Sequence, residues 1–418
     1  MISVITPTHN NDHILETFIS LKAQQYGGDW EWVLVPNGGT VLPPQIPLDP
    51  RVSIHPAPSG LTNIGALKRF ACEKARGDIV VELDHDDILM PNALQEVEQA
   101  LSGDAVFAYS NAVEFRNGTW EPFTYSEEFG WRYRDFEYQG HALKEAIAFP
   151  ATPHSLSYIW YAPNHLRAWK AADYWAVGGH DAGMRVIDDH DLMCRLYLRG
   201  KFVHIDKPLY LYRVHGQNTW LKLNAEIQQR THEVYAKYAR KLVEVWCDRE
   251  GYRKLDLGSA RGQCPKGLES VDVREGCDVQ ADLTKPWPFE DSSIGAIIAN
   301  DFIEHLPDKV HTMNEIHRVL KPGGFLFSST PSTDGRGAFQ DPTHVSYWNE
   351  NSFWYYTRRE LAHYVPEIKA RFQVKRLGTH YPSAWHEQNK ISYVVADLVA
   401  LKPGFDRPEK HIPGSIEI

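Results

Sequence analysis

Three aspartates follow directly after an apolar, β-branched run in the stretch IVVELDHDDIL, from Ile79 to Leu89. Asp84, Asp86 and Asp87 would stand together at the C-terminal end of a strand, where their negative charges repel one another. A divalent cation removes that repulsion and can also bridge carboxylates to phosphate oxygens. The stretch therefore predicts a magnesium or manganese site for a diphosphate-bearing ligand. An acidic loop that caps a helix from Asn92 is the alternative.

The chain that must position this cluster has 418 residues, more than one hydrophobic core usually supports, so two domains are expected. Charged residues at 23% and hydrophobic residues at 43% are typical of soluble globular proteins. A net charge of -10 argues against a nucleic-acid partner, because proteins that bind nucleic acids need clustered lysine and arginine. The five cysteines show no paired spacing, which predicts a reducing compartment and neither a zinc nor a disulfide framework.

The N-terminus and the hydropathy of the chain bear on its location. No run of about 18 apolar residues occurs, so no membrane span is expected. Met1 leads directly into the apolar run Ile2–Ile5, without a basic region or a cleavage site. These features predict a cytoplasmic protein.

Short apolar runs alternate with helical patterns along the first part of the chain. This alternation predicts a doubly wound α/β domain, whose ligands lie at the C-terminal ends of the strands. After a long amphipathic pattern, the alternation restarts at RKLDLG, beyond Gly251. We therefore expect two Rossmann-like α/β domains, over residues 1–220 and 251–418, joined by a long helix over 221–250.

The alternation of apolar runs and helical patterns becomes less regular between about Trp120 and Trp175, where aromatic residues accumulate. Flat rings stack on sugar faces, so this segment could form an acceptor platform, although aromatic rings more often fill a core. Both alternatives remain open. Beyond it we expect a helix at about His190–Arg199 and two strands, KFVHI and LYLYRV.

Five motifs stand in a fixed order before residue 220: PTHN, GALKRF, ELDHDD, the segment GGHDAGMRVIDDHDL, and YRVHGQNT. In this order they resemble the inverting family 2 glycosyltransferases of GT-A fold. The resemblance implies a nucleotide-sugar donor, a glycan acceptor and a manganese or magnesium ion. The residues expected to bind the donor are Pro7, Thr8 and Asn10 beside the nucleotide, Lys68 and Arg69 facing the diphosphate, and Gly179 beside the sugar.

The same resemblance assigns roles to four polar residues. Asp86 is expected to bind the metal directly, and Asp84 to contact ribose or the metal. Asp189 takes the place of the catalytic base at a helix start, where the helix dipole favours an ionised carboxylate. Ordinary helix capping is the alternative for Asp189. His215 matches the family's late histidine, which joins the metal or clasps the diphosphate.

Two positions depart from the family pattern. Asn37 lies in the turn PNGG after the second expected strand, where the family usually carries an aspartate pair that contacts the nucleobase. An amide both donates and accepts hydrogen bonds, whereas a carboxylate only accepts them. The nucleobase therefore stays open. Phe70 stands where an asparagine commonly follows the arginine.

Beyond Gly251 the motif LDLGSARG, the long segment DVQADLTKPWPFEDSSIGAIIANDFIEHL and HRVLKPGGFLF follow one another. Together they resemble class I S-adenosylmethionine-dependent methyltransferases over residues 251 to about 400. The resemblance implies S-adenosylmethionine as a cofactor. The residues expected to bind it are Asp256, Gly258, Gly262, Asp272, Asp282 and Asn300.

Methyl transfer from a sulfonium needs an acceptor oxygen aligned with the methyl group and little water nearby. A base helps when the acceptor is a hydroxyl group. His305 in IEHL and His344 in QDPTHVSYW are candidates, because an imidazole is partly neutral near physiological pH. The alternatives are a packing residue for His305 and a plain turn around His344.

These motifs predict one bifunctional enzyme, which transfers a sugar and methylates an oxygen of the same glycan. Fusion would keep an intermediate at raised local concentration. The alternative is a methyltransferase whose N-terminal domain is a non-catalytic scaffold that binds a glycan or a nucleotide.

Overall fold

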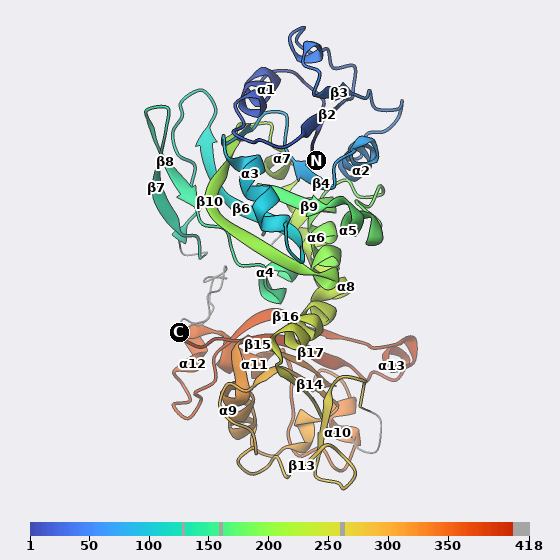
Figure 1. The fold of residues 1–418 in the computed structure, drawn as a ribbon. Helices are drawn as coiled ribbons and strands as arrows, with labels where there is room; N and C mark the ends of the chain where they lie inside the picture. The colour runs from blue at the N-terminus through green and yellow to red at the C-terminus, as the bar shows by residue number, and fades with distance from the viewer. Residues whose placement is uncertain (128–129, 159–161, 260–263, 404–418) are drawn as a thin grey trace. The chain divides into compact units, whose positions relative to one another are not determined.

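The computed structural model describes residues 1–403 apart from 128–129, 159–161 and 260–263. It divides into two compact units, Met1–Leu242 and Val243–Ile418. In each unit helices cover a β-sheet, as Figure 1 shows. The predicted α/β fold class is therefore confirmed.

The first unit is built on a mixed sheet of ten strands among the described residues. Its strands are β1 (Ile2–Thr8), β2 (Trp30–Pro36), β3 (Val52–Ile54), β4 (Ile79–Glu82), β5 (Ile88–Leu89), β6 (Ala105–Arg116), β7 (Tyr133–Tyr138), β8 (His141–Ala146), β9 (Arg167–Lys170) and β10 (Lys201–Val214). Its helices are α1 (Ile14–Lys22), α2 (Ile64–Lys74), α3 (Ala93–Leu101), α4 (Pro153–Tyr158), α5 (Ala171–Ala176), α6 (Asp188–Arg199) and α7 (Thr219–Lys222), with a 3₁₀ turn, η1 (Ile46–Leu48). Helix α8 (Asn224–Glu250) follows.

The strands β3, β2, β1 and β4 run parallel to one another, and β1 and β2 are buried on both faces. The order of the sheet is β3-β2-β1-β4-β9-β6-β10-β5, with the β7–β8 hairpin attached to β6. Successive side chains of a strand point to opposite faces, so Val4 packs with Phe18 of α1, whereas Ile5 packs with Leu67 of α2. Helices thus cover both faces, which explains the nearly continuous apolar runs of β1 and β2.

Two parts of this unit differ from the sequence-based expectation. The aromatic segment contains regular elements, and its strand β9 inserts antiparallel between β4 and β6. Trp131 and Trp169 are buried there, so these rings belong to the core. KFVHI and LYLYRV form one strand, β10, whose register against β6 shifts around Pro208. Proline cannot donate to the ladder, so the strand continues only through this irregularity.

The second unit has a seven-stranded sheet in the order β13-β12-β11-β14-β15-β17-β16. Its strands are β11 (Arg253–Leu257), β12 (Glu269–Asp272), β13 (Val279–Gln280), β14 (Ile294–Asn300), β15 (Leu320–Pro331), β16 (Phe372–His380) and β17 (Tyr393–Ala400). Its helices are α9 (Lys309–Val319), α10 (Gly337–Gln340), α11 (Glu350–Thr357), α12 (Arg359–Ala362) and α13 (Ala384–Gln388), with a 3₁₀ turn, η3 (Ile303–His305). Among the described strands of this sheet, β17 alone runs opposite to the others, so its pairings with β15 and β16 are antiparallel.

The chain order reverses between β11 and β14, which lie side by side. In doubly wound sheets ligands bind at such a switch point, beyond the carboxyl ends of the strands. Leu255 faces one core cluster with Met313 of α9, and Ile298 faces another with Cys247 of α8. None of the helices in the described part of the chain combines the length and apolar character that a membrane span needs.

Candidate active sites

The parallel strands β1, β2 and β4 end at one edge of the first sheet. Thr8, the last residue of β1, pairs with Pro36 at the end of β2, and Asn37 N donates to Thr8 O over 2.8 Å. Asn10 Oδ1 lies 3.1 Å from Nε2 of His85, in the loop after β4. The edge therefore brings together four residues expected beside the nucleotide: Pro7, Thr8, Asn10 and Asn37.

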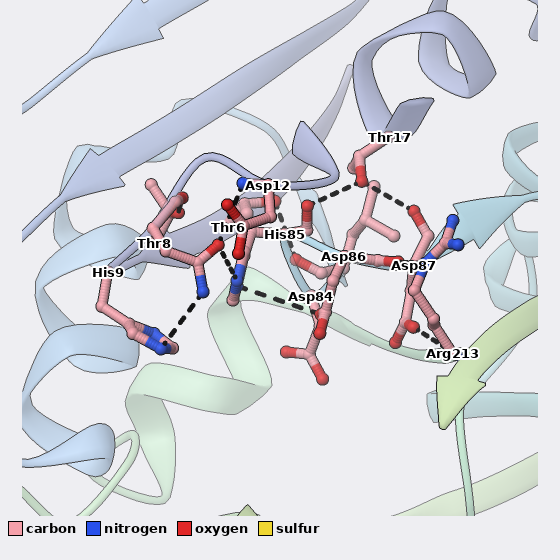
Figure 2. Close-up of polar contacts among 12 residues, drawn as sticks. Thr6, Thr8, His9, Asp12, Thr17, Asp84, His85, Asp86, Asp87 and Arg213 are labelled. Carbon is pink, nitrogen blue, oxygen red and sulfur yellow. Dashed lines mark hydrogen bonds and ion pairs between the residues drawn. The ribbon is translucent and has the colours of Figure 1, made fainter. Parts of the chain in front are cut away.

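One of the three aspartates after β4 is structural. Asp87 is buried, and its carboxylate accepts hydrogen bonds from Tyr210 Oη (2.8 Å) and Arg213 N (2.7 Å), as Figure 2 shows for Arg213. Burial raises the pKa of Asp87 well above its ordinary value. Thr17 of α1 donates to the Asp87 carbonyl oxygen over 2.8 Å. These bonds fix the acidic loop and leave the other two aspartates for a ligand.

Asp86 forms a close pair with His215. Asp86 Oδ2 lies 2.7 Å from His215 Nε2, and the backbone N–H of Gln217 donates to His215 Nδ1 over 3.1 Å. Because Nδ1 accepts, the hydrogen of the neutral ring resides on Nε2 and points at the carboxylate. Burial favours the protonated form of Asp86, but the bond from His215 and the nearby charges of His215 and His85 together outweigh burial and lower the pKa of Asp86. His215 thus orients an ionised Asp86.

Asp84 stands apart from that pair. Its Oδ2 lies 3.9 Å from His165 Nε2, and burial raises the pKa of Asp84 to about 7. Within the described residues, the possible ligand atoms of Asp84, Asp86 and His215 do not all come within 4.8 Å of one another. Proteins usually hold Mg²⁺ through one or two carboxylates together with substrate phosphates. The ionised Asp86 carboxylate at the sheet edge fits that mode of binding.

A buried network of charges lies next to the acidic loop. The Lys68 ammonium contacts Glu82 and lies 3.8 Å from Asp188 Oδ2. The Arg167 guanidinium contacts Asp189 and lies 3.9 Å from Glu82 Oε2. Glu82 and Arg167 are also register partners of β4 and β9. The network therefore connects the strand before the acidic loop with the start of α6.

The two neighbouring aspartates at the start of α6 differ in charge. Burial raises the pKa of Asp188 to about 7. Burial is also the largest influence on Asp189, but Arg167 and Lys68 together outweigh it and hold the pKa of Asp189 well below its usual range. The helix N-cap is Ile187, without a side-chain cap bond, so neither aspartate caps the helix. Environments that separate two pKa values in this way distinguish an acid from a base.

The two cations expected at the diphosphate are engaged within the first unit. Lys68 is buried against Glu82, and Arg69 Nη1 donates to the carbonyl oxygen of Gly178. Gly179 has a φ of +67°, and a Cβ there would lie 2.8 Å from the ring of Tyr174. Arg69 therefore holds a glycine loop that has no room for a side chain at residue 179.

In the second unit the turn after β11 lies at the switch point. Gly258 has a φ of +79°, and a Cβ there would lie 2.5 Å from Phe302, in the turn after β14. Gly258 N donates to Val271 O of β12 over 2.8 Å. Asp256 lies on β11, and Ser259 Oγ donates to its carbonyl oxygen. Gly262 lies outside the described residues.

The remaining residues expected at the cofactor follow the neighbouring strands. Asp272 ends β12, and its Oδ1 accepts from Arg274 N over 2.8 Å. Asp282 Oδ1 accepts from Thr284, which lowers the pKa of Asp282. Asn300 ends β14 and is exposed. These side chains thus lie at or just beyond the carboxyl ends of β12, β13 and β14.

The two candidate histidines of this unit are brought together by the fold. His305 ends η3, and His344 lies in the loop between α10 and α11, with ring centroids 5.1 Å apart. One ring nitrogen of each histidine and one carboxylate oxygen of Glu304 lie within 4.8 Å of one another. The two histidines are far apart in sequence, so their proximity could not be predicted. It results from the packing of the loop against η3.

A family model described as "Glycosyl transferase family 2" matches residues 3–157, and one described as "Methyltransferase domain" matches residues 257–328. The chain thus carries one segment matched by the family 2 glycosyltransferase model and, after it, one matched by the methyltransferase model. The expected recognition and the expected enzyme classes are confirmed at this level.

Individual relatives agree with the two domains. A chondroitin synthase of Pasteurella multocida is 24% identical over 239 residues, which cover 56% of this chain and 22% of the relative. A probable S-adenosylmethionine-dependent methyltransferase of Mycolicibacterium smegmatis is 29% identical over 117 residues, 27% of this chain and 40% of the relative. The chain thus spans less than half of these relatives. A structure of S. aureus TarS in complex with UDP has a TM-score of 0.40 at 16% identity, over 57% of this chain and 70% of that chain.

Several charged residues of the glycosyltransferase domain were not predicted from the sequence. Glu82, Arg167 and Arg213 are buried within strands, where an unpaired charge would be costly. Each has a charged partner in the structure. A charged residue inside an apolar strand, as in IVVEL and LYLYRV, is the signal that could have revealed them.

Proposed function

We propose that the chain is a bifunctional transferase, which carries out metal-dependent inverting sugar transfer from a nucleotide-sugar donor to a glycan and S-adenosylmethionine-dependent O-methylation of that glycan. The two domain families support this proposal. The observation that carries it is the position of Arg167, which contacts Asp189 and also lies beside Glu82 at the end of β4. A candidate base and the acidic loop therefore share one edge of the sheet.

Sugar transfer with inversion is a single displacement. Asp189 would take the proton of the acceptor hydroxyl as its oxygen attacks the anomeric carbon, and the bond to the nucleoside diphosphate breaks. Each carboxylate oxygen of Asp189 already accepts one bond, from Arg167 and from His190 N, but retains a second acceptor position. A Mg²⁺ or Mn²⁺ ion held by Asp86 would stabilise the charge on the leaving diphosphate.

The methyltransferase domain would bind its cofactor at the switch point. Gly258 would let the cofactor approach the backbone, Asp256 would lie near its amino-acid end, Asp272 would bind the ribose hydroxyls, and Asp282 the adenine amino group. S-adenosylmethionine supplies a methyl group on a sulfonium. The acceptor hydroxyl must lose its proton, and His305 and His344, whose rings lie close together, would assist that step.

The test combines both substrates with the purified chain. With a panel of nucleotide sugars, Mn²⁺ and glycan acceptors, we expect release of nucleoside diphosphate and transfer of label from S-adenosylmethionine to the glycan. If the scaffold alternative holds, the methyl label enters the glycan but no donor is turned over. If label enters equally well before and after sugar transfer, the methylated sugar is not the transferred one.

A further inference from the structure

The methyltransferase domain contains its own cluster of side chains that could bind a metal. Glu304, His305 and His344 each offer one ligand atom, and these atoms lie within 4.8 Å of one another. Bond lengths of about 2 Å place the ligands of one zinc ion roughly 3.3 Å apart, so a small inward movement of the side chains would close the site. It is the one such group among the residues that the structure describes.

The hydrogen bonds of the two imidazoles use Nδ1 of each ring and leave Nε2 available to bind a metal. His305 Nδ1 lies 3.1 Å from Thr343 O, and His344 Nδ1 lies 3.0 Å from Ala338 O. A carbonyl oxygen only accepts, so in both neutral rings the hydrogen resides on Nδ1 and the lone pair on Nε2. Metal-binding histidines show this pattern, in which the second ring nitrogen donates to a carbonyl or carboxylate. His215 shows the opposite pattern.

Glu304 supplies an independent observation. The residue is buried, with 2% of its surface exposed. Its Oε2 accepts from Thr330 Oγ1 over 2.6 Å, whereas its Oε1 is buried without a hydrogen-bond partner. A buried carboxylate oxygen without a partner is costly. A cation coordinated beside it would remove that cost.

The backbone holds the ligands in place. Glu304 O accepts from Val345 N (2.9 Å) and Ser346 N (3.0 Å), and Ser346 Oγ donates to Ile303 O. The loop that carries His344 is therefore fastened to the turn that carries the other two ligands. Sites fixed in this way need little rearrangement on binding.

We propose that Glu304, His305 and His344 bind a divalent transition metal, with Zn²⁺ as the ion that suits two imidazoles, one carboxylate and an open position. The proposal rests on the O-methylation proposed above. An acceptor hydroxyl at the open position would lose its proton to solvent more readily. Its oxygen would then bond to the sulfonium methyl carbon as the carbon–sulfur bond breaks, giving a methyl ether and S-adenosylhomocysteine.

Exposed aromatic side chains beside this cluster suit a carbohydrate acceptor. Phe339 and Tyr347 are 62% and 44% exposed, and their ring centroids lie 5.2 Å apart. They flank His344 in sequence: Phe339 lies in α10, and Tyr347 lies in the loop fastened to η3. Both rings offer an apolar face, Tyr347 adds a polar hydroxyl, and sugar rings pack against such faces.

Metal binding can be tested apart from activity. The full chain carrying Asp86→Asn is titrated with Co²⁺, and visible absorption and equilibrium dialysis are recorded. We expect one Co²⁺ per chain at this cluster, displaced by Zn²⁺. Adding Glu304→Gln, His305→Asn or His344→Asn should weaken that binding at least tenfold. His363→Asn, which changes an exposed histidine, is the matched control. Retained S-adenosylmethionine binding shows that each variant is folded.

The outcomes separate this site from the proposed function. If all three ligand variants bind Co²⁺ like Asp86→Asn alone, the metal site does not exist. Methylation that survives complete metal removal but is lost in His344→Asn assigns these histidines as general bases and also overturns it. Metal binding that needs the three ligands, without methylation of any glycan, leaves the site standing and contradicts the proposed function instead.

Discussion

Arg167 Nη1 donates to Asp189 Oδ2, and this contact fixes the charge state of the residue proposed as the catalytic base. Arg167 is 3% exposed, so the pair lies where water screens it little. The bond keeps Asp189 ionised and oriented, although it also makes the carboxylate a weaker base. Asp188, its neighbour, has a raised pKa and no such bond to Arg167.

Asp189→Asn should abolish most sugar transfer and leave donor binding intact. An amide cannot take the acceptor's proton, so we expect the transfer rate to fall roughly 10²- to 10⁴-fold. Transfer rates and calorimetric binding of the nucleotide sugar would be measured together. Asp181→Asn, at an exposed aspartate, is the control that should stay near the parent rate. An active Asp189→Asn variant would remove this residue from the mechanism.

Asp86 and His215 should differ in their effect on Mn²⁺. Because Asp86 is assigned as the ligand, Asp86→Asn should remove Mn²⁺-dependent donor binding. His215→Gln should weaken Mn²⁺ binding by only about 10- to 100-fold, since His215 orients the carboxylate. Electron paramagnetic resonance of Mn²⁺ titrations measures both. Equal losses in the two variants would indicate that His215 is itself a ligand.

Lys68→Met should destabilise the first unit by about 3–5 kcal/mol, because it leaves Glu82 buried beside Arg167 without its nearest cation. Urea unfolding measures the change. Lys201→Met breaks an exposed ion pair with Asp104 and should cost at most about 1 kcal/mol. Similar small losses in both variants would mean that the buried network contributes little to stability.

Gly258→Val should prevent binding of S-adenosylmethionine, because a side chain at this positive φ would also collide with Phe302. Gly276→Ala is the matched control, since Gly276 has a φ of +91° but no atom within 4 Å of an added Cβ. Both variants incur backbone strain, and only Gly258→Val adds the collision. Calorimetry with the cofactor distinguishes them. Normal affinity in Gly258→Val would place the cofactor elsewhere.

We expect the second unit to lose stability in mild acid, because His317 is buried in its neutral form. Burial lowers the pKa of His317 to about 4, and its Nε2 donates to Leu401 O. In the unfolded chain the pKa of His317 is 6.5, so above pH 6.5 the ring is mostly neutral in both the folded and the unfolded state. As the pH falls below 6.5, His317 binds a proton in the unfolded chain but not in the folded chain. The free energy of unfolding therefore falls until the pH reaches the pKa of His317 in the folded chain. Between pH 7.5 and 5 the loss should be roughly 2 kcal/mol.

Urea unfolding at the two pH values measures this loss. His317→Gln keeps a donor for Leu401 O but cannot titrate, so its unfolding free energy should fall by roughly 2 kcal/mol less than that of the parent. Identical pH dependence in parent and variant would contradict the assignment.

Several features of the fold could be predicted from the sequence because their signals are local. The apolar runs of β1, β4 and β11, and the helical pattern of α3, appear within short windows, so the α/β class followed from them. The strand β9 could not be predicted in this way. It has four residues, RAWK, and exists because β4 and β6 offer ladder partners on both sides.

The sequence by itself determined the two family resemblances and the groups of residues that could act in catalysis or binding, since motif order and residue type are properties of the sequence. Only the tertiary structure decided the role of each residue: that Asp87 supports the loop, that Lys68 neutralises Glu82, and that Arg167 reaches Asp189. Charge state and hydrogen-bond direction depend on burial and on partners distant in sequence, and folding alone brings those together.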